Sequence, residues 1–253
     1  MRPEPYVWSL HPEAVAALAL PVAAYGLALR RYSPPAWRVV AFALGFLLLL
    51  ATAVTPLDSL TFHLLSAHLL QNVVLAEWAP ALLVLGIPPA LGERLTENSV
   101  LRVLTRPLVA LPLWLGTYFL WHLPPAYDAA LEHPLTLLHL EHASYVAAGL
   151  LFWWPVFQDH PWRLPPSQRA GYVFAAFVLA SPIGLLLALL PNAIYDFYVE
   201  GAGLWGLSPL TDQQIAGITM AAEQAVVFFV VAAFYFARFL ANEERRENYA
   251  TEA

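Results

Sequence analysis

Two histidines lie close together in a strongly apolar part of the sequence. His139 and His142 stand near the start of the run 137–155, which reads LLHLEHASYVAAGLLFWWP. On an α-helix, residues three positions apart lie on one face, about one turn from each other. Imidazoles bind metal ions, and ionisable residues inside a membrane span are rare, costly and usually functional. The pair therefore predicts a ligand site; the alternative is that it only forms hydrogen bonds to neighbouring helices.

The composition indicates the environment of this pair. The chain has 253 residues, of which 60% are hydrophobic and 12% charged, about half of the charged fraction typical of soluble domains. This balance predicts a membrane protein in contact with the lipid bilayer. The sequence has no cysteine, which excludes disulfides and thiolate sites, so that a metal would need His, Met, Asp or Glu. The few basic residues are scattered, which excludes nucleic acid as a partner.

Seven segments are long and apolar enough to form membrane spans of about 20 residues. We expect an all-α fold, in which residues 1–253 form one transmembrane domain that ends in a polar cytoplasmic tail at 241–253. The expected spans, with approximate ends, are 12–29, 39–56, 62–86, 107–124, 134–156, 169–191 and 213–240.

The arginines predict the orientation of these spans. The loops at 57–61, 125–133 and 192–212 contain no arginine, and the chain has no lysine. By the positive-inside rule, the N-terminus lies outside and the C-terminus in the cytoplasm. Apart from Arg2, the basic residues all fall on the predicted cytoplasmic side: Arg30, Arg31, Arg38, Arg94, Arg102, Arg106, Arg163, Arg169, Arg238, Arg245 and Arg246.

In this topology most histidines fall in the outer half of the molecule. Depth follows from a rise of about 1.5 Å per helical residue. Several polar or sulfur-bearing side chains then share a layer roughly 8–12 Å below the outer end, or about one turn deeper. This layer contains His68, His139, His142 and Met220, with Asn72 and Glu223 below it and His122 just under the surface.

The residue types leave the ligand open. Histidine with methionine suits copper, whereas histidine with carboxylate suits zinc or non-haem iron, and two facing histidines bind haem. The string at 139–142, HLEH, is neither H-E-x-x-H nor H-x-x-E-H, and the sequence contains no G-x-S-x-G or P-loop motif. We therefore expect no enzymatic activity.

An ordered series of short motifs resembles one known family. The series consists of SAHLLQ at 66–71, WHLP at 121–124, the pair His139-x-x-His142 running into FWWP at 152–155, and DQQ-x-AG at 212–217. It resembles the CtaG-like family of bacterial cytochrome c oxidase assembly factors, which are seven-span proteins, and the likeness covers spans two to seven.

The resemblance implies a role in respiratory chain biogenesis at the bacterial inner membrane. It implies that the chain handles copper on the outer side during maturation of a haem–copper oxidase, with an oxidase subunit as its partner. The polar positions of the family fall on His68, His122, Asp128, His139, His142, Asp212 and Gln213.

The sequence departs from the family pattern at two places. The family usually has a second histidine four residues after the match to His68, where this chain has Asn72. After the match to Met220, the family tends to have Trp and Pro, where this chain has Ala221, Ala222 and Glu223. These departures shift the expected ligation toward the pair on span five and toward Glu223.

The resulting hypothesis is a transient copper site. Its expected ligands are His68, His139 and His142, with His122 at the mouth and Met220 or Glu223 below. Three outer residues, Asp128, Asp212 and Gln213, would fix the loops around it, and Asn72 would support it. The alternatives are a haem-binding electron-transfer protein and a scaffold or chaperone that holds an oxidase subunit without any ligand.

Overall fold

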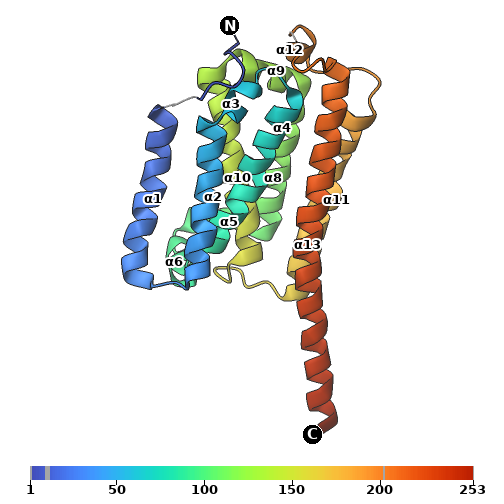
Figure 1. Ribbon diagram of the computed structural model, residues 1–253. Helices are drawn as coiled ribbons and strands as arrows, with labels where there is room; N and C mark the ends of the chain where they lie inside the picture. The colour runs from blue at the N-terminus through green and yellow to red at the C-terminus, as the bar shows by residue number, and fades with distance from the viewer. Residues whose placement is uncertain (1, 9–11, 202, 253) are drawn as a thin grey trace.

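The chain folds into a bundle of helices. The structure, a computed structural model, describes residues 2–8, 12–201 and 203–252, which contain helices and no strand. Figure 1 shows the long helices side by side, with α1 at the periphery and α13 extending far beyond the bundle. The N-terminus lies at one end with α3, α9 and α12, which we call the N-terminal end; α6 and the C-terminus lie toward the opposite, C-terminal end (Figure 1).

Among the described residues, six long helices and the consecutive pair α4 and α5 run along the bundle, and other short helices connect them. The helices along the bundle are α1 (Pro12–Tyr32), α2 (Ala36–Val54), α4 (Leu65–Val73), α5 (Ala79–Gly86), α8 (Pro107–His122), α10 (His139–Phe157), α11 (Pro166–Leu189) and α13 (Pro209–Glu252). A π-helical turn, Val74–Trp78, joins α4 to α5, and a second, Pro134–Leu138, precedes α10. The connecting helices are α3 (Pro56–Leu60), α6 (Pro89–Leu95), α7 (Ser99–Leu104), α9 (Pro124–Glu132) and α12 (Asp196–Val199).

Five helical segments among the described residues are long and apolar enough to cross a membrane. They are Ala36–Val54, Leu65–Gly86, Pro134–Phe157, Pro166–Leu189 and Pro209–Asn248. The first expected span coincides with α1 and the fourth with α8, which has only 16 residues. The predicted helical fold class is therefore confirmed, while the seven spans and their orientation stay predictions. The last helix also continues through most of the segment expected to be a polar tail.

The segment Leu65–Gly86, which combines α4, the first π-helical turn and α5, is the central helix of the bundle. Of its most apolar 18 residues, 72% are buried, against 22–39% in the other four candidate spans. It packs against α2, α10 and α13. Polar side chains on this helix therefore lie inside the protein and do not face lipid, as expected for ionisable groups at this depth.

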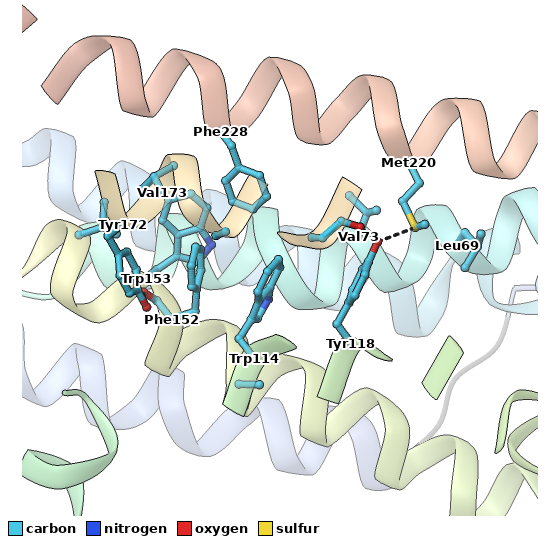
Figure 2. Close-up of a cluster of buried hydrophobic side chains, with 14 of the residues drawn as sticks. Leu69, Val73, Trp114, Tyr118, Phe152, Trp153, Tyr172, Val173, Met220 and Phe228 are labelled. Carbon is cyan, nitrogen blue, oxygen red and sulfur yellow. Dashed lines mark hydrogen bonds between the residues drawn. The ribbon is translucent and has the colours of Figure 1, made fainter. Parts of the chain in front are cut away.

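Aromatic side chains fill the core between α8, α10 and α13. Figure 2 shows Trp114, Phe152, Trp153 and Phe228 among them. The Trp114 and Phe152 rings are stacked with centroids 4.7 Å apart, and Trp153 stacks on Phe228 at 5.6 Å. Such pairs stabilise a packed core beyond the area that they bury. The Phe-Trp-Trp-Pro string thus forms the contact between three helices.

A glycine brings α10 close to the central helix. A Cβ atom at Gly149 would collide with the carbonyl oxygen of Ala76 and would lie 2.7 Å from Cγ of Pro80. Small residues at helix contacts allow such close approach in membrane bundles. Because Gly149 lies seven residues after His142, the two share a face of α10. The contact therefore sets how closely the start of α10 approaches α4.

The start of α4 is capped by a residue from another helix. Leu64, which precedes α4, provides no side-chain cap. The Asp212 carboxylate of α13 instead accepts hydrogen bonds from the backbone amides of Leu65 (2.5 Å) and Ser66 (3.2 Å) and from the Ser66 hydroxyl (2.5 Å). A carboxylate at a helix N-terminus satisfies free amides and interacts favourably with the helix dipole. This cap fixes α4 against α13, one turn before His68.

We predict that Gly149→Ala destabilises the protein, because the added methyl group collides with backbone atoms of the central helix. The free energy of unfolding should fall by about 1–3 kcal/mol, as in overpacked cores. Gly116→Ala on α8 is the matched control, since a Cβ there meets nothing within 4 Å. Thermal or SDS-induced unfolding of the purified variants measures both changes. Equal stability of the two variants would contradict the close contact.

We also predict that Asp212→Ala destabilises the start of α4, because three hydrogen bonds to one carboxylate are lost. The cost should be about 1–3 kcal/mol, and Asp212→Asn, which keeps one oxygen acceptor, should cost less. Hydrogen exchange at the amides of Leu65 and Ser66 provides a local measurement. Unchanged exchange in the alanine variant would show that this cap does not hold α4.

Candidate functional site

His68 lies at the centre of a buried polar cluster. Its side chain is fully buried, and its Nδ1 lies 3.2 Å from the hydroxyl oxygen of Tyr198. That hydroxyl donates its single hydrogen to the carbonyl oxygen of Thr61 at 2.6 Å, so the network assigns the proton of the imidazole to Nδ1. The Nε2 atom is then unprotonated. It has no hydrogen-bond partner among the described residues and lies 3.6 Å from Oε1 of Glu141.

Glu141, which was not among the predicted site residues, is the second member of the cluster. Its side chain is fully buried, and its Oε1 accepts a hydrogen bond of 2.8 Å from Nδ2 of Asn72. The Oε2 atom has no partner in the part of the chain that the structure describes. The sequence does contain a signal, because Glu141 is an acid inside an apolar run of membrane length.

Asn72 joins the cluster through its amide group. It orients the Glu141 carboxyl group through this hydrogen bond. Its Oδ1 atom is buried and has no partner within the described ranges. The position therefore contributes to the site by holding a carboxylate and by presenting a free oxygen.

The structure brings only one of the two predicted histidines of α10 to His68. The His142 ring lies 6.2 Å from the His68 ring, nearly perpendicular to it, and its Nε2 is buried with no partner among the described residues. His139 is exposed and does not join the cluster. The side chains of His139 and His142 differ in direction by about 60° around the helix axis. This rotation is enough to leave His139 outside, while Glu141 and His142 face the interior.

His122 lies beside the cluster at the end of α8. Its Nδ1 is 2.7 Å from the carbonyl oxygen of Tyr118, so Nδ1 carries the proton and donates it. The Nε2 atom is buried and unpartnered as far as the structure describes the chain. The Tyr127 ring lies 4.8 Å from the ring of His68 and 6.4 Å from that of His122. Both histidines thus pack on one tyrosine of α9.

Met220 lies in the wall of a small cavity. It is buried, and its sulfur is 3.6 Å from the Tyr118 hydroxyl (Figure 2). The cavity has a volume of about 10 Å³ and is also lined by Asn72, Glu77 and Tyr145. This volume is room for about one water molecule. The cavity connects the level of Asn72 with the level of Met220.

Glu223 belongs to a different cluster, one that surrounds the first π-helical turn. Its Oε2 accepts a hydrogen bond of 2.8 Å from the indole of Trp78, and its carboxyl group interacts with that of Glu77. Glu77 in turn accepts a hydrogen bond of 2.8 Å from Gln224. The structure therefore places Glu223 with another buried acid, and not with His68.

Two of the predicted supporting residues hold connecting segments at the N-terminal end. Asp128 accepts hydrogen bonds from the backbone amides of Asp196 (3.2 Å) and Phe197 (3.1 Å) at the start of α12. Partial burial raises the pKa of the Asp128 carboxyl, while these amides act in the opposite direction. Gln213 accepts a hydrogen bond of 2.9 Å from the Ile194 amide. With the Asp212 cap on α4, these contacts position the segment that carries Tyr198.

The cluster is not a closed metal site. Within the described ranges, no group of three or more His, Asp or Glu side chains is arranged to hold a metal ion. Yet buried polar atoms without partners cost about 1–3 kcal/mol each, and such atoms indicate a ligand or bound water. The unpartnered atoms at this site are nitrogen and oxygen atoms of the kinds that bind metal ions: Nε2 of His68, His122 and His142, Oε2 of Glu141 and Oδ1 of Asn72.

Several mycobacterial proteins are similar to this chain. An uncharacterised protein of Mycobacterium leprae is 25% identical over 226 residues, which cover 79% of this chain and 34% of that protein. Uncharacterised proteins of Mycobacterium bovis and Mycobacterium tuberculosis are each 26% identical over 259 residues, which cover 90% of this chain and 38% of those proteins. The chain thus spans little more than a third of the length of the curated relatives it matches. No solved structure matches it.

The family comparison agrees with the motifs. The family model described as cytochrome c oxidase caa3 assembly factor matches residues 22–242, which include the central helix, the His68 cluster and most of α13. The resemblance of the ordered motifs is thereby confirmed. The chain belongs to the Caa3_CtaG family of cytochrome c oxidase assembly factors.

Proposed function

We propose that the chain assists the assembly of a haem–copper oxidase by holding a copper ion transiently between α4 and α10. The ligands are His68, His142 and Glu141, and the copper is cargo that passes to an oxidase subunit. The role is non-catalytic. It is placed at the outer face of the bacterial inner membrane, because α9 and α12, which pack over the cluster, belong to the end that the arginine distribution predicts to be outside.

The main support for this proposal is the hydrogen bonding of His68, which uses Nδ1 and leaves Nε2 free. Metal-binding histidines donate their second ring N–H to a fixed acceptor, which orients the ring. In His68 that acceptor is the Tyr198 hydroxyl oxygen, and the free Nε2 faces Glu141 at 3.6 Å. Two donors bound to one ion through bonds of about 2.0–2.2 Å lie roughly 3.0–3.5 Å apart. A small movement of either side chain therefore suffices to bind an ion.

An open site suits a protein that must release its cargo. Structural metal sites are closed by four protein ligands, whereas sites that exchange a ligand keep a position open. Here Asn72, which donates a hydrogen bond to Glu141, also lines a small cavity together with Met220. Nitrogen, oxygen and thioether donors together are compatible with both oxidation states of copper, the sulfur favouring Cu(I).

The size of the site favours a metal ion over haem. The buried cavity next to these residues has a volume of about 10 Å³, whereas cofactor pockets have volumes of about 300–1,000 Å³. A haem could bind between His68 and His142 only if the bundle opened widely. Zinc also fits the nitrogen and carboxylate donors; because Cu(II) binds more tightly than Zn(II) at most such sites, a preference for zinc would exclude copper.

The two histidines of α10 offer a matched test of copper binding. Equilibrium dialysis of the purified protein against Cu(I), Cu(II) and Zn(II), with elemental analysis, should show about one copper bound. His68→Ala, His142→Ala and Glu141→Gln should each weaken binding by about tenfold or more, because each removes a donor. His139→Ala removes the same side chain from an exposed position of the same helix and should leave binding unchanged.

Two outcomes of this experiment would overturn the site. Equal copper uptake by the His142→Ala and His139→Ala variants would show that the buried cluster is not the binding place. Tighter binding of zinc than of copper by the unaltered protein would make copper the wrong cargo. Thermal unfolding of each variant shows whether it is folded.

A second experiment separates copper handling from a scaffold role. In the host bacterium, His142→Ala should lower oxidase activity and the copper content of the oxidase, while His139→Ala should not. Added copper should restore the oxidase in the His142→Ala strain, because mass action compensates for a weakened site. If His142→Ala supports full assembly without added copper, the chain acts as a ligand-free scaffold and the proposal is wrong.

A further inference from the structure

A large pocket lies at the C-terminal end of the bundle, far from the His68 cluster. It has a volume of about 390 Å³, within the range of ligand sites. It lies where the loop between α10 and α11 meets α13, at the level where α13 leaves the bundle (Figure 1). Polar and basic residues dominate its lining, which includes Asp159, Arg163, Arg169, Tyr235, Arg238 and Asn242.

One arginine forms the buried wall of this pocket. The Arg169 guanidinium is mostly buried and pairs with the Asp159 carboxylate. It also donates hydrogen bonds to the carbonyl oxygens of Val156 (2.9 Å) and Leu164 (3.0 Å). Its charge is therefore neutralised and its position fixed by the loop. Arg169 shapes the pocket but has little capacity left for a ligand.

Two other arginines keep their charge available. Arg163, in the loop, and Arg238, on α13, are both exposed, and their guanidinium groups form no ion pair or hydrogen bond with the residues that the structure describes. The Arg238 guanidinium only lies 5.8 Å from the ring of Phe234. Two uncompensated positive charges thus face one pocket in a chain whose net charge is −6.

The backbone at the pocket adds to the positive potential. Pro165 and Pro166, at the start of α11, line the pocket, and Pro165 provides no side-chain cap. Both prolines lack an amide hydrogen, and the Gln168 amide donates to the Pro165 carbonyl oxygen at 3.0 Å, so this 24-residue helix contributes the positive end of its dipole to the pocket. Phosphate groups are common ligands at such positions when basic side chains also converge there.

An apolar side chain lies next to the charged pocket. On α13, Phe234 is exposed one turn before Arg238, and its ring lies 5.8 Å from the Arg238 guanidinium. Four residues beyond Arg238, the helix becomes polar at Asn242 and continues with charged residues. The pocket therefore lies at the boundary between the apolar and polar parts of α13. A ligand here meets cationic groups at one side and an apolar helix surface at the other.

We propose that this pocket binds the phosphate group of an anionic phospholipid, with Arg163 and Arg238 as its charged contacts. The acyl chains lie along the apolar surface of α13. Basic pockets between helices on the cytoplasmic side recognise anionic headgroups in this way. The bound lipid ties the loop between α10 and α11 to α13 at the point where α13 leaves the bundle. This site does not depend on copper binding.

The proposal is tested by lipid retention. Native mass spectrometry of the full chain, exchanged into detergent with phosphatidylglycerol or phosphatidylcholine, should show retention of the anionic lipid only. The double variant Arg163→Gln/Arg238→Gln should weaken this retention by about tenfold or more, given about 1 kcal/mol per basic residue at a membrane surface. The double variant Arg245→Gln/Arg246→Gln loses equal charge from α13 outside the pocket and should retain the lipid.

The outcomes separate the two sources of the phosphate. Equal retention by both double variants overturns the site, and equal retention of both lipids overturns the choice of an anionic headgroup. Inorganic phosphate is tested alone by thermal shift. If it stabilises the unaltered protein and phosphatidylglycerol does not compete with it, the pocket is a site for a free anion and the lipid proposal is wrong.

Discussion

The arrangement of the bundle depends on one constraint: polar groups of the enclosed central helix must find partners on other helices. Water is not available to them in an apolar interior, and apolar contact alone specifies little when lipid competes for the same surfaces. Each main neighbour of the helix meets this need at a different place. The Gln71 amide donates to the Thr52 carbonyl oxygen on α2, Asn72 donates to Glu141 on α10, Gln224 on α13 donates to Glu77, and His68 donates to Tyr198 on α12.

Each of these side chains forms hydrogen bonds through only some of its polar atoms. The atoms that stay without a partner connect the fold to the proposed function. The His68, Asn72 and Glu141 side chains each use one atom to fix a neighbour and leave another atom without a partner among the described residues. The bonded atoms define the geometry, and the free atoms define a place for a ligand. A membrane protein that must bind and release an ion benefits from this division, because releasing the ion leaves the contacts between helices intact.

Apolar runs were enough to predict the helical class and the approximate positions of the longest helices, but not the short helices α3, α9 and α12. A constant rise per residue also predicts one layer for His68, His142 and Met220, of which the structure brings His68 and His142 together, with their rings 6.2 Å apart. Rotation about the helix axis could not be obtained in this way. It puts His139 outside, turns Glu141 inward and directs Glu223 to Trp78. The Asp212 cap on α4 could not be predicted from the sequence either, because it joins residues far apart in the chain that only tertiary packing brings together.

The π-helical turn Val74–Trp78 changes the directions of the side chains that follow it on the central helix. Asn72 and Glu77 are five residues apart and would differ in direction by about 140° on a regular α-helix, yet both line the same small cavity. A π-helical turn accommodates one additional residue, and such turns frequently occur at functional sites. The extra residue of the central helix therefore brings Asn72 and Glu77 to one cavity. Deleting one residue from this turn would rotate Glu77 relative to Asn72 and would separate the two side chains.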